Sequence, residues 1–154
     1  MQELSKTHLV FTSYKDEPVL IGYFTLSAKT ILIAKNILSK NLQKRINKFA
    51  SYSPELRRYM ISAPLIAQLG KNYHKGYNHL ITGDELLQIA CDQVQKAQTV
   101  IGGKIAYLEC EDHKKLIEFY ERNGFVHFGK RLLDKDEADR MSGKYLVQML
   151  RYFR

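Results

Sequence analysis

The chain has 154 residues, of which 45% are hydrophobic and 26% charged; this is typical of a single globular domain over residues 1–154 and excludes a disordered chain. No run approaches the ~20 apolar residues that span a bilayer, and the N-terminus lacks the pattern of a signal peptide, so we expect a cytoplasmic protein with no membrane segment. The formal net charge of +8 favours attraction to a polyanion, either a nucleotide cofactor or a nucleic acid, without choosing between them.

The first part of the chain is rich in strand-forming residues. Residues 8–14 form a short β-rich run. Residues 18–27 and 30–35 follow as two apolar runs, and we interpret them as a strand pair around a tight connection at residues 28–29. Pro18 opens the second of the three runs, a position that a strand tolerates. This region therefore predicts antiparallel strands.

A basic, polar block separates these strands from the next apolar run. Residues 37–59 tolerate a helix and contain Pro54 as a break, so we predict one or two short helices there. Residues 60–70 have the length and composition of another strand. Pro64 lies inside that run, and we expect the strand to bend there or to start late.

Helical spacing is clearest after residue 82. Thr82 followed three residues later by Glu85 is the sequence of a capping box. An apolar stripe follows at helical spacing and is formed by Leu86, Leu87, Ala90, Val94 and Ala97. Residues 102–110 then predict a buried strand.

The C-terminal part predicts one helix and two strands. Asp112 can cap a helix that carries Leu116, Ile117, Phe119 and Tyr120. Residues 123–124, Asn-Gly, are a plausible helix stop, because glycine adopts the left-handed conformation easily. Residues 125–133 and 144–153 predict two final strands, and residues 134–143 predict a charged loop between them.

This order of elements predicts an α/β (α+β) fold. A strand–helix–strand unit over residues 61–109 implies two parallel strands joined by a right-handed crossover, whereas the ends of the chain imply antiparallel flanks. We therefore expect a mixed, mainly antiparallel sheet with a central parallel strand pair flanked by helices. The two cysteines, Cys91 and Cys110, lack metal-ligand spacing, and we expect reduced core thiols and no metal site.

Two segments carry a resemblance to a known family. The stretch "GDELL" at residues 83–87, together with "LECEDHKKLIEFYERNGF" at residues 108–125, resembles the GNAT superfamily of acyl-CoA-dependent N-acetyltransferases, in particular its toxin-like bacterial members. The resemblance extends from about Thr7 to the C-terminus and implies acetyl-CoA as the acyl donor. Members of the superfamily usually begin with helices that form one wall of the site where the acceptor substrate binds. The chain resembles a form lacking most of those helices, which implies an exposed apolar surface and a possible homodimer.

The loop before residue 83 is the expected phosphate site. Strand, loop and helix start together make a ready anion site, because backbone N–H groups point out of the helix end. The superfamily pattern places glycines where this chain has Ile81 and Gly83, so only the second glycine matches, and Asn78 stands at the Arg or Gln position. Asp84 and the residue after it would compete with a pyrophosphate for the helix end. The resemblance implies a cofactor-binding set of Gln68, Leu69, Gly70, Lys71, Asn78, His79, Leu80, Ile81, Thr82, Gly83, Asp84 and His113.

Several of these side chains have a plainer interpretation. Lys71, Lys75 and His79 either supply compensating positive charge to the cofactor or only solvate a loop. His113 stands where relatives often place an asparagine that contacts the pantetheine arm, and it can equally be an exposed residue at a helix start. These alternatives stay open at the level of the sequence.

Catalytic roles also come from the resemblance. Tyr120 matches a tyrosine that can protonate the departing thiolate as a general acid, although its spacing also fits a core aromatic. A main-chain N–H near residues 69–70 would stabilise the oxyanion. Glu111, or Glu109 beside it, could deprotonate the amine through water, or could simply be an acidic residue at a strand end. We therefore select Tyr120 and Glu111 as the catalytic candidates.

Three functions remain in competition. The leading one is transfer of an acetyl group from acetyl-CoA to a primary amine by direct attack on the thioester. A second keeps the chemistry but takes an aminoacyl-tRNA as the acceptor, as in a growth-inhibiting toxin, and the basic surface motivates it. A third is a degenerate, non-catalytic binding module of the same fold, motivated by the eroded glycine pattern.

Overall fold

One mixed seven-stranded sheet organises the computed structural model, which describes residues 5–141 and 143–154. The strands follow the order β1-β2-β4-β5-β7-β6, and the short β3 pairs with β4. β4 and β5 are parallel, with α2 between them in the chain, and every other pair is antiparallel. The strands are β1 (Ser5–Tyr14), β2 (Glu17–Ala34), β3 (Ser51–Ser53), β4 (Arg58–Lys71), β5 (Ile105–Glu111), β6 (Val126–Leu132) and β7 (Tyr145–Tyr152).

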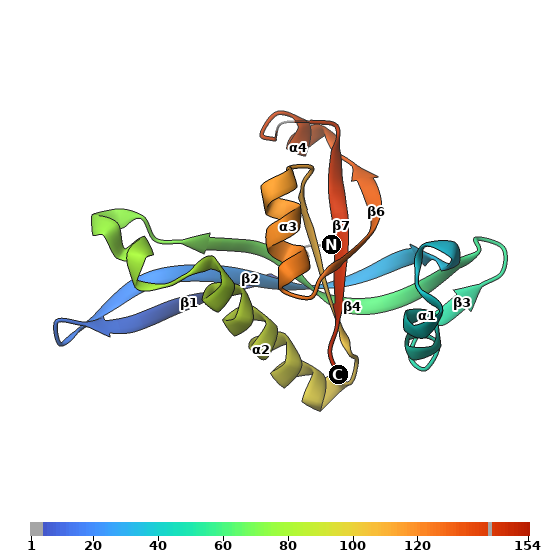
Figure 1. The fold of residues 1–154 in the computed structure, drawn as a ribbon, viewed down its shortest axis with the longest axis horizontal. Helices are drawn as coiled ribbons and strands as arrows, with labels where there is room; N and C mark the ends of the chain where they lie inside the picture. The colour runs from blue at the N-terminus through green and yellow to red at the C-terminus, as the bar shows by residue number, and fades with distance from the viewer. Residues whose placement is uncertain (1–4, 142) are drawn as a thin grey trace.

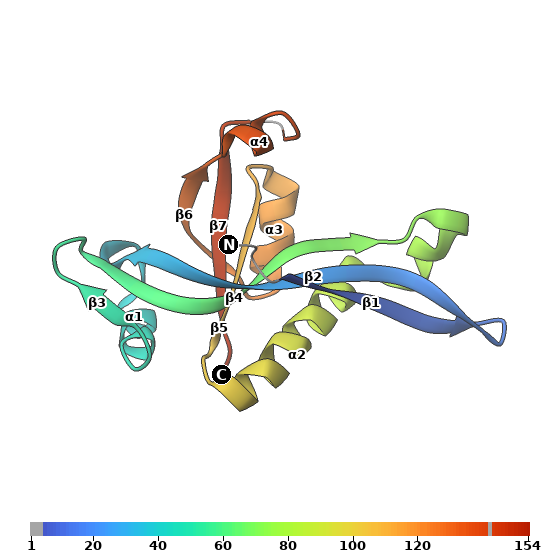
Figure 2. The same ribbon diagram turned by 180° about the vertical axis from the view of Figure 1, so that it is seen from behind.

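Two of these strands are much longer than the others and set the shape of the molecule. Figure 1 shows β2 and β4 crossing the sheet as a long ribbon, with β5, β6 and β7 running across it. One end of the ribbon carries the β1–β2 hairpin and the loop before α2, and the other end carries α1 and β3, which is also clear from behind in Figure 2. The helices are α1 (Lys40–Ile46), α2 (Gly83–Ile101), α3 (Lys114–Arg122) and α4 (Lys135–Ala138).

The mixed sheet with one parallel pair confirms the fold class expected from the sequence, but the details of the first half differ. The predicted turn at residues 28–29 is wrong, because β2 is one continuous strand. Ala28 and Lys29 pair with Pro64 and Ala63 of β4, so the long partner strand supports both halves of β2. Residues 28–29 contain none of the glycine, asparagine or proline residues that a two-residue hairpin turn needs.

The basic block contains a short helix, as predicted, and also two features that the sequence did not indicate. A three-residue strand, β3, pairs with the start of β4, and β4 already begins at Arg58. Pro64 neither bends nor delays the strand. The irregularity lies at Ala67 instead, where Leu26 pairs with Ile66 and Thr25 pairs with Gln68, so that Ala67 is an extra residue that forms a β-bulge.

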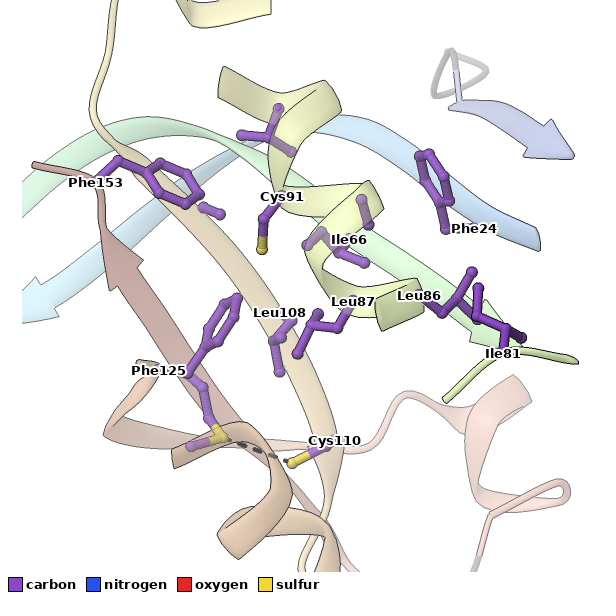
Figure 3. Close-up of a cluster of buried hydrophobic side chains, with 14 of the residues drawn as sticks. Phe24, Ile66, Ile81, Leu86, Leu87, Cys91, Leu108, Cys110, Phe125 and Phe153 are labelled. Atoms are coloured by element: carbon purple, nitrogen blue, oxygen red, sulfur yellow. Dashed lines mark hydrogen bonds between the residues drawn. The ribbon is translucent and has the colours of Figure 1, made fainter. Parts of the chain in front are cut away.

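Two hydrophobic clusters cover opposite faces of the sheet. Successive side chains of a strand point to opposite faces, and β5 accordingly sends Leu108 and Cys110 into the first cluster and Ile105 and Tyr107 into the second. The first cluster is packed by α2 and α3, and Figure 3 shows its side chains. The second includes Leu38, Ile46, Tyr59, Phe128 and Leu150. Cys91 and Cys110 are buried free thiols, as the sequence predicted.

The helix ends follow local rules with one exception. α2 begins with the predicted capping box, and α3 ends at Asn123 with Gly124 in the left-handed region at a φ of 87°. The prediction that Asp112 caps α3 is wrong, since its carboxylate accepts a hydrogen bond from Lys130 at 2.7 Å and His113 is the N-cap residue. The charged loop at residues 134–143 contains the short α4. Among the described residues, no helix is both long and apolar enough to cross a membrane.

Candidate active site

A gap opens in the middle of the sheet, between β4 and β5. The two strands pair only where Leu65 meets Tyr107 and Ile66 meets Leu108. Beyond this crossing, residues 67–71 of β4 and 109–111 of β5 have no partner across the gap within the described structure. Because successive amides of a strand point to opposite edges, alternate N–H and C=O groups of β4 face this gap. The gap therefore presents an unpaired strand edge to an extended ligand.

Gly70 lies on this open segment and has no room for a side chain. A Cβ atom there would come within 2.8 Å of the Tyr23 ring on β2. The β-bulge at Ala67 marks the start of the same segment, since a bulge removes one residue from regular pairing and re-aims the strand. The predicted residues Gln68, Leu69, Gly70 and Lys71 are thus brought together on one strand edge.

The N-terminus of α2 is capped by reciprocal hydrogen bonds between Thr82 and Glu85. The Thr82 hydroxyl accepts from the Glu85 amide at 3.1 Å, and the Glu85 carboxylate accepts from the Thr82 amide at 2.7 Å. The Thr82 hydroxyl also lies 3.0 Å from the same carboxylate oxygen, and the hydrogen bonds that the amide and the hydroxyl of Thr82 donate to this carboxylate hold the pKa of Glu85 below its usual value. A carboxylate therefore already satisfies one of the amides that a diphosphate would use, and Gly83 and Asp84 supply the two remaining amides at the helix start.

The neighbouring carboxylate, Asp84, is turned toward α3. Arg122 donates two hydrogen bonds to it, each at 3.0 Å, and Asn123 donates a third at 2.7 Å. These bonds, the one from Arg122 foremost, lower the pKa of Asp84 to about 2. The competition between Asp84 and an anion that the sequence predicts is therefore reduced, because its charge is matched by Arg122. The same contacts tie the end of α3 to the start of α2.

The loop between β4 and α2 does not form the glycine-rich turn of the family pattern. Ile81 is extended, with a φ of −147°, and its side chain is 6% exposed in the first core cluster. The left-handed residues are instead Lys75 and Gly76. Lys71 donates a hydrogen bond to the Asn78 carbonyl at 3.3 Å, which ties the loop to the strand. Leu80 and His79 are exposed at the outer side of the loop.

Tyr120 lies on α3 and packs against the first core cluster, which also contains Ile81. Its ring packs edge-on against Phe119 and Phe125, and a Cβ atom on Gly83 would lie 3.3 Å from the Phe119 ring. Burial raises the pKa of Tyr120 to about 12, so the phenol is protonated at neutral pH. Within the described residues, no hydrogen bond from another side chain engages its hydroxyl. Tyr120 is thus both a packing residue and a proton donor that has not been committed elsewhere.

The two glutamates at the end of β5 differ. Glu109 is 11% exposed and forms an ion pair with Arg131, so its charge is already matched within the protein. Glu111 is exposed at the end of β5. Both alternate with Cys110 along the strand, so they point to the face opposite Tyr120. His113 is exposed at the start of α3 and caps nothing with its side chain.

Two hollows of about 540 and 520 Å³ lie away from the gap, on either side of α1.

Three side chains order the candidate site through contacts that the sequence did not predict. Arg122 and Asn123 bind the Asp84 carboxylate, and Arg131 binds the Glu109 carboxylate. "FYERNGF" contains the first two, but spacing alone does not reveal which carboxylate they reach.

The chain has no match among protein-family models and none among curated proteins. Solved structures do match it. A KacT variant matches with a TM-score of 0.56 and 19% identity, over 94% of this chain and 69% of that one. A bacterial toxin matches with a TM-score of 0.53 and 21% identity, over 86% and 60%. Naa20 of Chaetomium thermophilum, in complex with a bisubstrate analogue, matches with a TM-score of 0.51 and 15% identity, over 94% and 65%.

These similarities establish the fold. The chain spans between 60% and 69% of the length of those three structures. At identities of 15–21% they carry no residue-level assignment.

Proposed function

From the fold that the chain shares with the GNAT acetyltransferases, which the resemblance in "GDELL" and "FYERNGF" implied, we propose that it is an acetyl-CoA-dependent N-acetyltransferase that acts on a primary amine. The observation that carries the proposal is the open β4–β5 gap, together with the two helices next to it: α2 packs on β4, α3 with Tyr120 packs on β5, and the start of α2 meets α3 where Gly83 lies against Phe119.

The residues present fit one part of acetyl-CoA better than another. The unpaired edge of β4 at residues 67–71 suits the amide groups of a pantetheine arm, because it offers both donors and acceptors. The start of α2 suits a diphosphate only after the Glu85 side chain has rotated away from Thr82. Lys71 lies near enough to lower the pKa of Glu85 and could then face the diphosphate. We therefore expect binding that is real but weakened by Glu85.

Acetyl-CoA would supply an acyl carbon already activated as a thioester. The amides of β4 that face the gap would stabilise negative charge on the carbonyl oxygen. The Tyr120 hydroxyl would donate a hydrogen bond to the leaving sulfur. Its pKa of about 12 lies well above the ~8.5 of a thiol, so Tyr120 stabilises the thiolate more readily than it surrenders a proton. Glu111, on the opposite face, would accept the proton of the amine through water.

Binding of acetyl-CoA tests the first part of this proposal. At about 100 times the dissociation constant a ligand adds ~2.7 kcal/mol to the free energy of unfolding, which thermal melting detects. No shift with acetyl-CoA or CoA at millimolar concentration would reject the proposal. Hydrogen exchange at residues 67–71 is the matching local measurement, because a ligand in the gap protects those amides.

The variant Tyr120→Phe tests the second part. It keeps the ring that packs on Phe119 and Phe125 and removes only the hydroxyl, so the fold and the affinity for acetyl-CoA should be retained. We expect the rate of CoA thiol release with an amine acceptor to fall by about 10²–10³-fold. Tyr73→Phe, at a residue that is 72% exposed, is the matched control. Equal rates in Tyr120→Phe and the wild type would exclude Tyr120 from the chemistry.

Two alternatives have observations of their own. An aminoacyl-tRNA acceptor is favoured by the basic segment at residues 35–58, and translation arrest on induced expression, relieved by Tyr120→Phe, would distinguish it. A non-catalytic binding module is favoured by the closed capping box at Thr82 and Glu85. Binding of CoA without turnover across a panel of amines would distinguish that reading.

A homodimer also stays a prediction. The edge strand β1 exposes Leu9 and Phe11, each 57% exposed, on one face. An edge strand of this kind favours association. A strictly monomeric species in light scattering at micromolar concentration would contradict the dimer.

A further inference from the structure

The positive charge of the chain is concentrated in one segment. Between residues 35 and 58 there are seven lysines and arginines and a single carboxylate, Glu55, which gives +6 out of the total of +8. This segment comprises α1, β3 and the first residue of β4, and it forms one end of the β2–β4 ribbon (Figure 1). The seven cations are Lys35, Lys40, Lys44, Arg45, Lys48, Arg57 and Arg58.

None of these seven side chains forms an ion pair with another described residue. Ion pairs lie elsewhere in the described chain, for example at Lys114, Arg122, Lys130 and Arg131. Lys40 and Lys44 are moreover spaced i,i+4 on α1, where like charges repel each other. The segment thus retains a charge that opposes its own helix.

The cations line two preformed hollows. Lys35, Arg57 and Arg58 line the hollow of about 540 Å³ on one side of α1. Arg45, Arg151 and Arg154 line the hollow of about 520 Å³ on the other side. Gln43 fixes the entry to α1, because its amide donates to the Lys35 and Leu38 carbonyls, each at 2.8 Å. The basic side chains are therefore held around a fixed backbone.

An aromatic ring lies beside each group of cations. The Lys35 ammonium is 5.3 Å from the centroid of Tyr52, which is 40% exposed and rests against Tyr59. The Arg45 guanidinium is 5.2 Å from the centroid of Tyr152. Cations next to an exposed ring suit a ligand that has both phosphates and planar bases.

A bilayer surface fits this segment less well. The apolar residues of α1, Leu42 and Ile46, face the second core cluster, and Ile46 is fully buried. The helix therefore has no free apolar face to insert between lipids, which membrane-surface helices require. The segment therefore fits a ligand whose phosphates bind to the cations at the surface, without insertion of apolar side chains into a bilayer.

We propose that residues 35–58, with Arg151 and Arg154, form a docking surface for a single-stranded nucleic acid, whose phosphates lie on the two groups of cations and one of whose bases stacks on Tyr52. This binding is independent of acetyl transfer, so it can be measured, and can fail, separately from the proposed enzymatic activity. If the acceptor is carried by an RNA, the surface also specifies which end of the β2–β4 ribbon that RNA contacts.

Fluorescence anisotropy with a labelled single-stranded RNA of about twelve nucleotides tests the surface. The logarithm of the binding constant should fall linearly with the logarithm of salt concentration, with a slope near −3 if about four phosphates are neutralised. The double variant Arg57→Gln/Arg58→Gln should weaken binding about tenfold or more and reduce that slope by about one unit.

The double variant Lys114→Gln/Lys115→Gln is the matched control, because it removes the same charge from exposed positions on α3. An equal loss in the control would overturn the proposal in favour of a non-specific effect of net charge. Absence of RNA binding at about 50 mM salt would also overturn it. So would binding to phosphatidylserine vesicles that RNA does not displace.

Tyr52→Ala and Tyr52→Phe test the stacking contact. Removal of the ring should weaken binding of the single strand by about five- to tenfold, whereas phenylalanine should retain it. Equal affinity of the wild type and Tyr52→Ala, with an RNA duplex bound as tightly as the single strand, would overturn the assignment of a base to Tyr52. Unchanged melting temperatures of all variants establish that the losses are not due to unfolding.

Discussion

The α1 segment and the β6–α4 region use arginine and lysine in opposite ways. In the β6–α4 region, Arg131 contacts Glu109, Asp134 and Glu137, and Lys130 contacts Asp112. In the α1 segment, seven cations have no carboxylate partner among the described residues. Cations in the first region stabilise the fold by joining strands and helices. Those in the second form no ion pair with a described carboxylate, which is the reason to look for an anionic ligand there.

The largest expected effect lies in the paired region. Arg131→Met leaves Glu109, 11% exposed, without its cation, and removes the link to α4. We expect the free energy of unfolding to fall by about 2 kcal/mol, below the range for a fully buried pair because Arg131 itself is 29% exposed. Urea denaturation measures this loss. A change within ~0.5 kcal/mol, the range of ordinary surface substitutions, would contradict a structural role for Arg131.

A second prediction concerns the carboxylate that closes α2. Glu85→Gln can still accept from the Thr82 amide, so the cap should be retained, but the full negative charge at the helix end is lost. We expect acetyl-CoA to bind about fivefold more tightly. Isothermal titration measures the affinity. The control is Asp92→Asn, which removes the same charge further along α2. An equal gain in affinity for acetyl-CoA in this control would mean that the Glu85 carboxylate does not compete with the diphosphate.

A third prediction uses acid. The pKa of Asp84 is lowered to about 2, mainly by its hydrogen bonds from Arg122. A lowered pKa stabilises the folded state above the unfolded value of ~3.9, and that stabilisation is lost as the pH falls toward 2. We therefore expect the melting temperature of the wild type to fall more steeply than that of Asp84→Asn between about pH 4 and pH 2. Parallel curves would show that the contact with Arg122 does not contribute in solution.

The smallest expected effect has the opposite sign. Lys40→Gln in the unpaired segment relieves repulsion with Lys44 one turn later and removes a cation from the first turn of α1, where the helix dipole disfavours it. It should raise the free energy of unfolding by about 0.3 kcal/mol. Thermal melting against Lys96→Gln, another exposed helical lysine, measures it. A clear destabilisation would show that Lys40 has a stabilising contact, and the contrast between the two regions would then be weaker.

Much of the fold followed from the sequence where periodicity and local caps agree. The parallel pair around α2 and the capping box at Thr82 and Glu85 were predicted because hydrophobic spacing and the cap point to the same helix. The turn at residues 28–29 was not a turn, since the length of β2 is decided by its pairing with β4 and not by its own residues. The short β3 likewise depends on a partner strand.

The site was predictable only in part. A resemblance selected Tyr120 and the start of α2, and both lie near the β4–β5 gap. The partners of the carboxylates could not be predicted, because Arg122 lies 38 positions from Asp84 and Arg131 lies 22 from Glu109. Ion pairs over such distances depend on the folded arrangement. The roles of Tyr120 in catalysis and of the start of α2 in cofactor binding stay predictions.

The brief crossing of β4 and β5 also has a mechanical consequence. In the described part of the chain, two register pairs join the half-sheet β1–β2–β4 to the half-sheet β5–β7–β6, and side-chain packing on both faces completes the junction. A ligand that hydrogen-bonds to both strands of the gap would therefore add a second connection between the two half-sheets. Its binding should restrict the rotation of one half-sheet relative to the other, and its release should restore that motion.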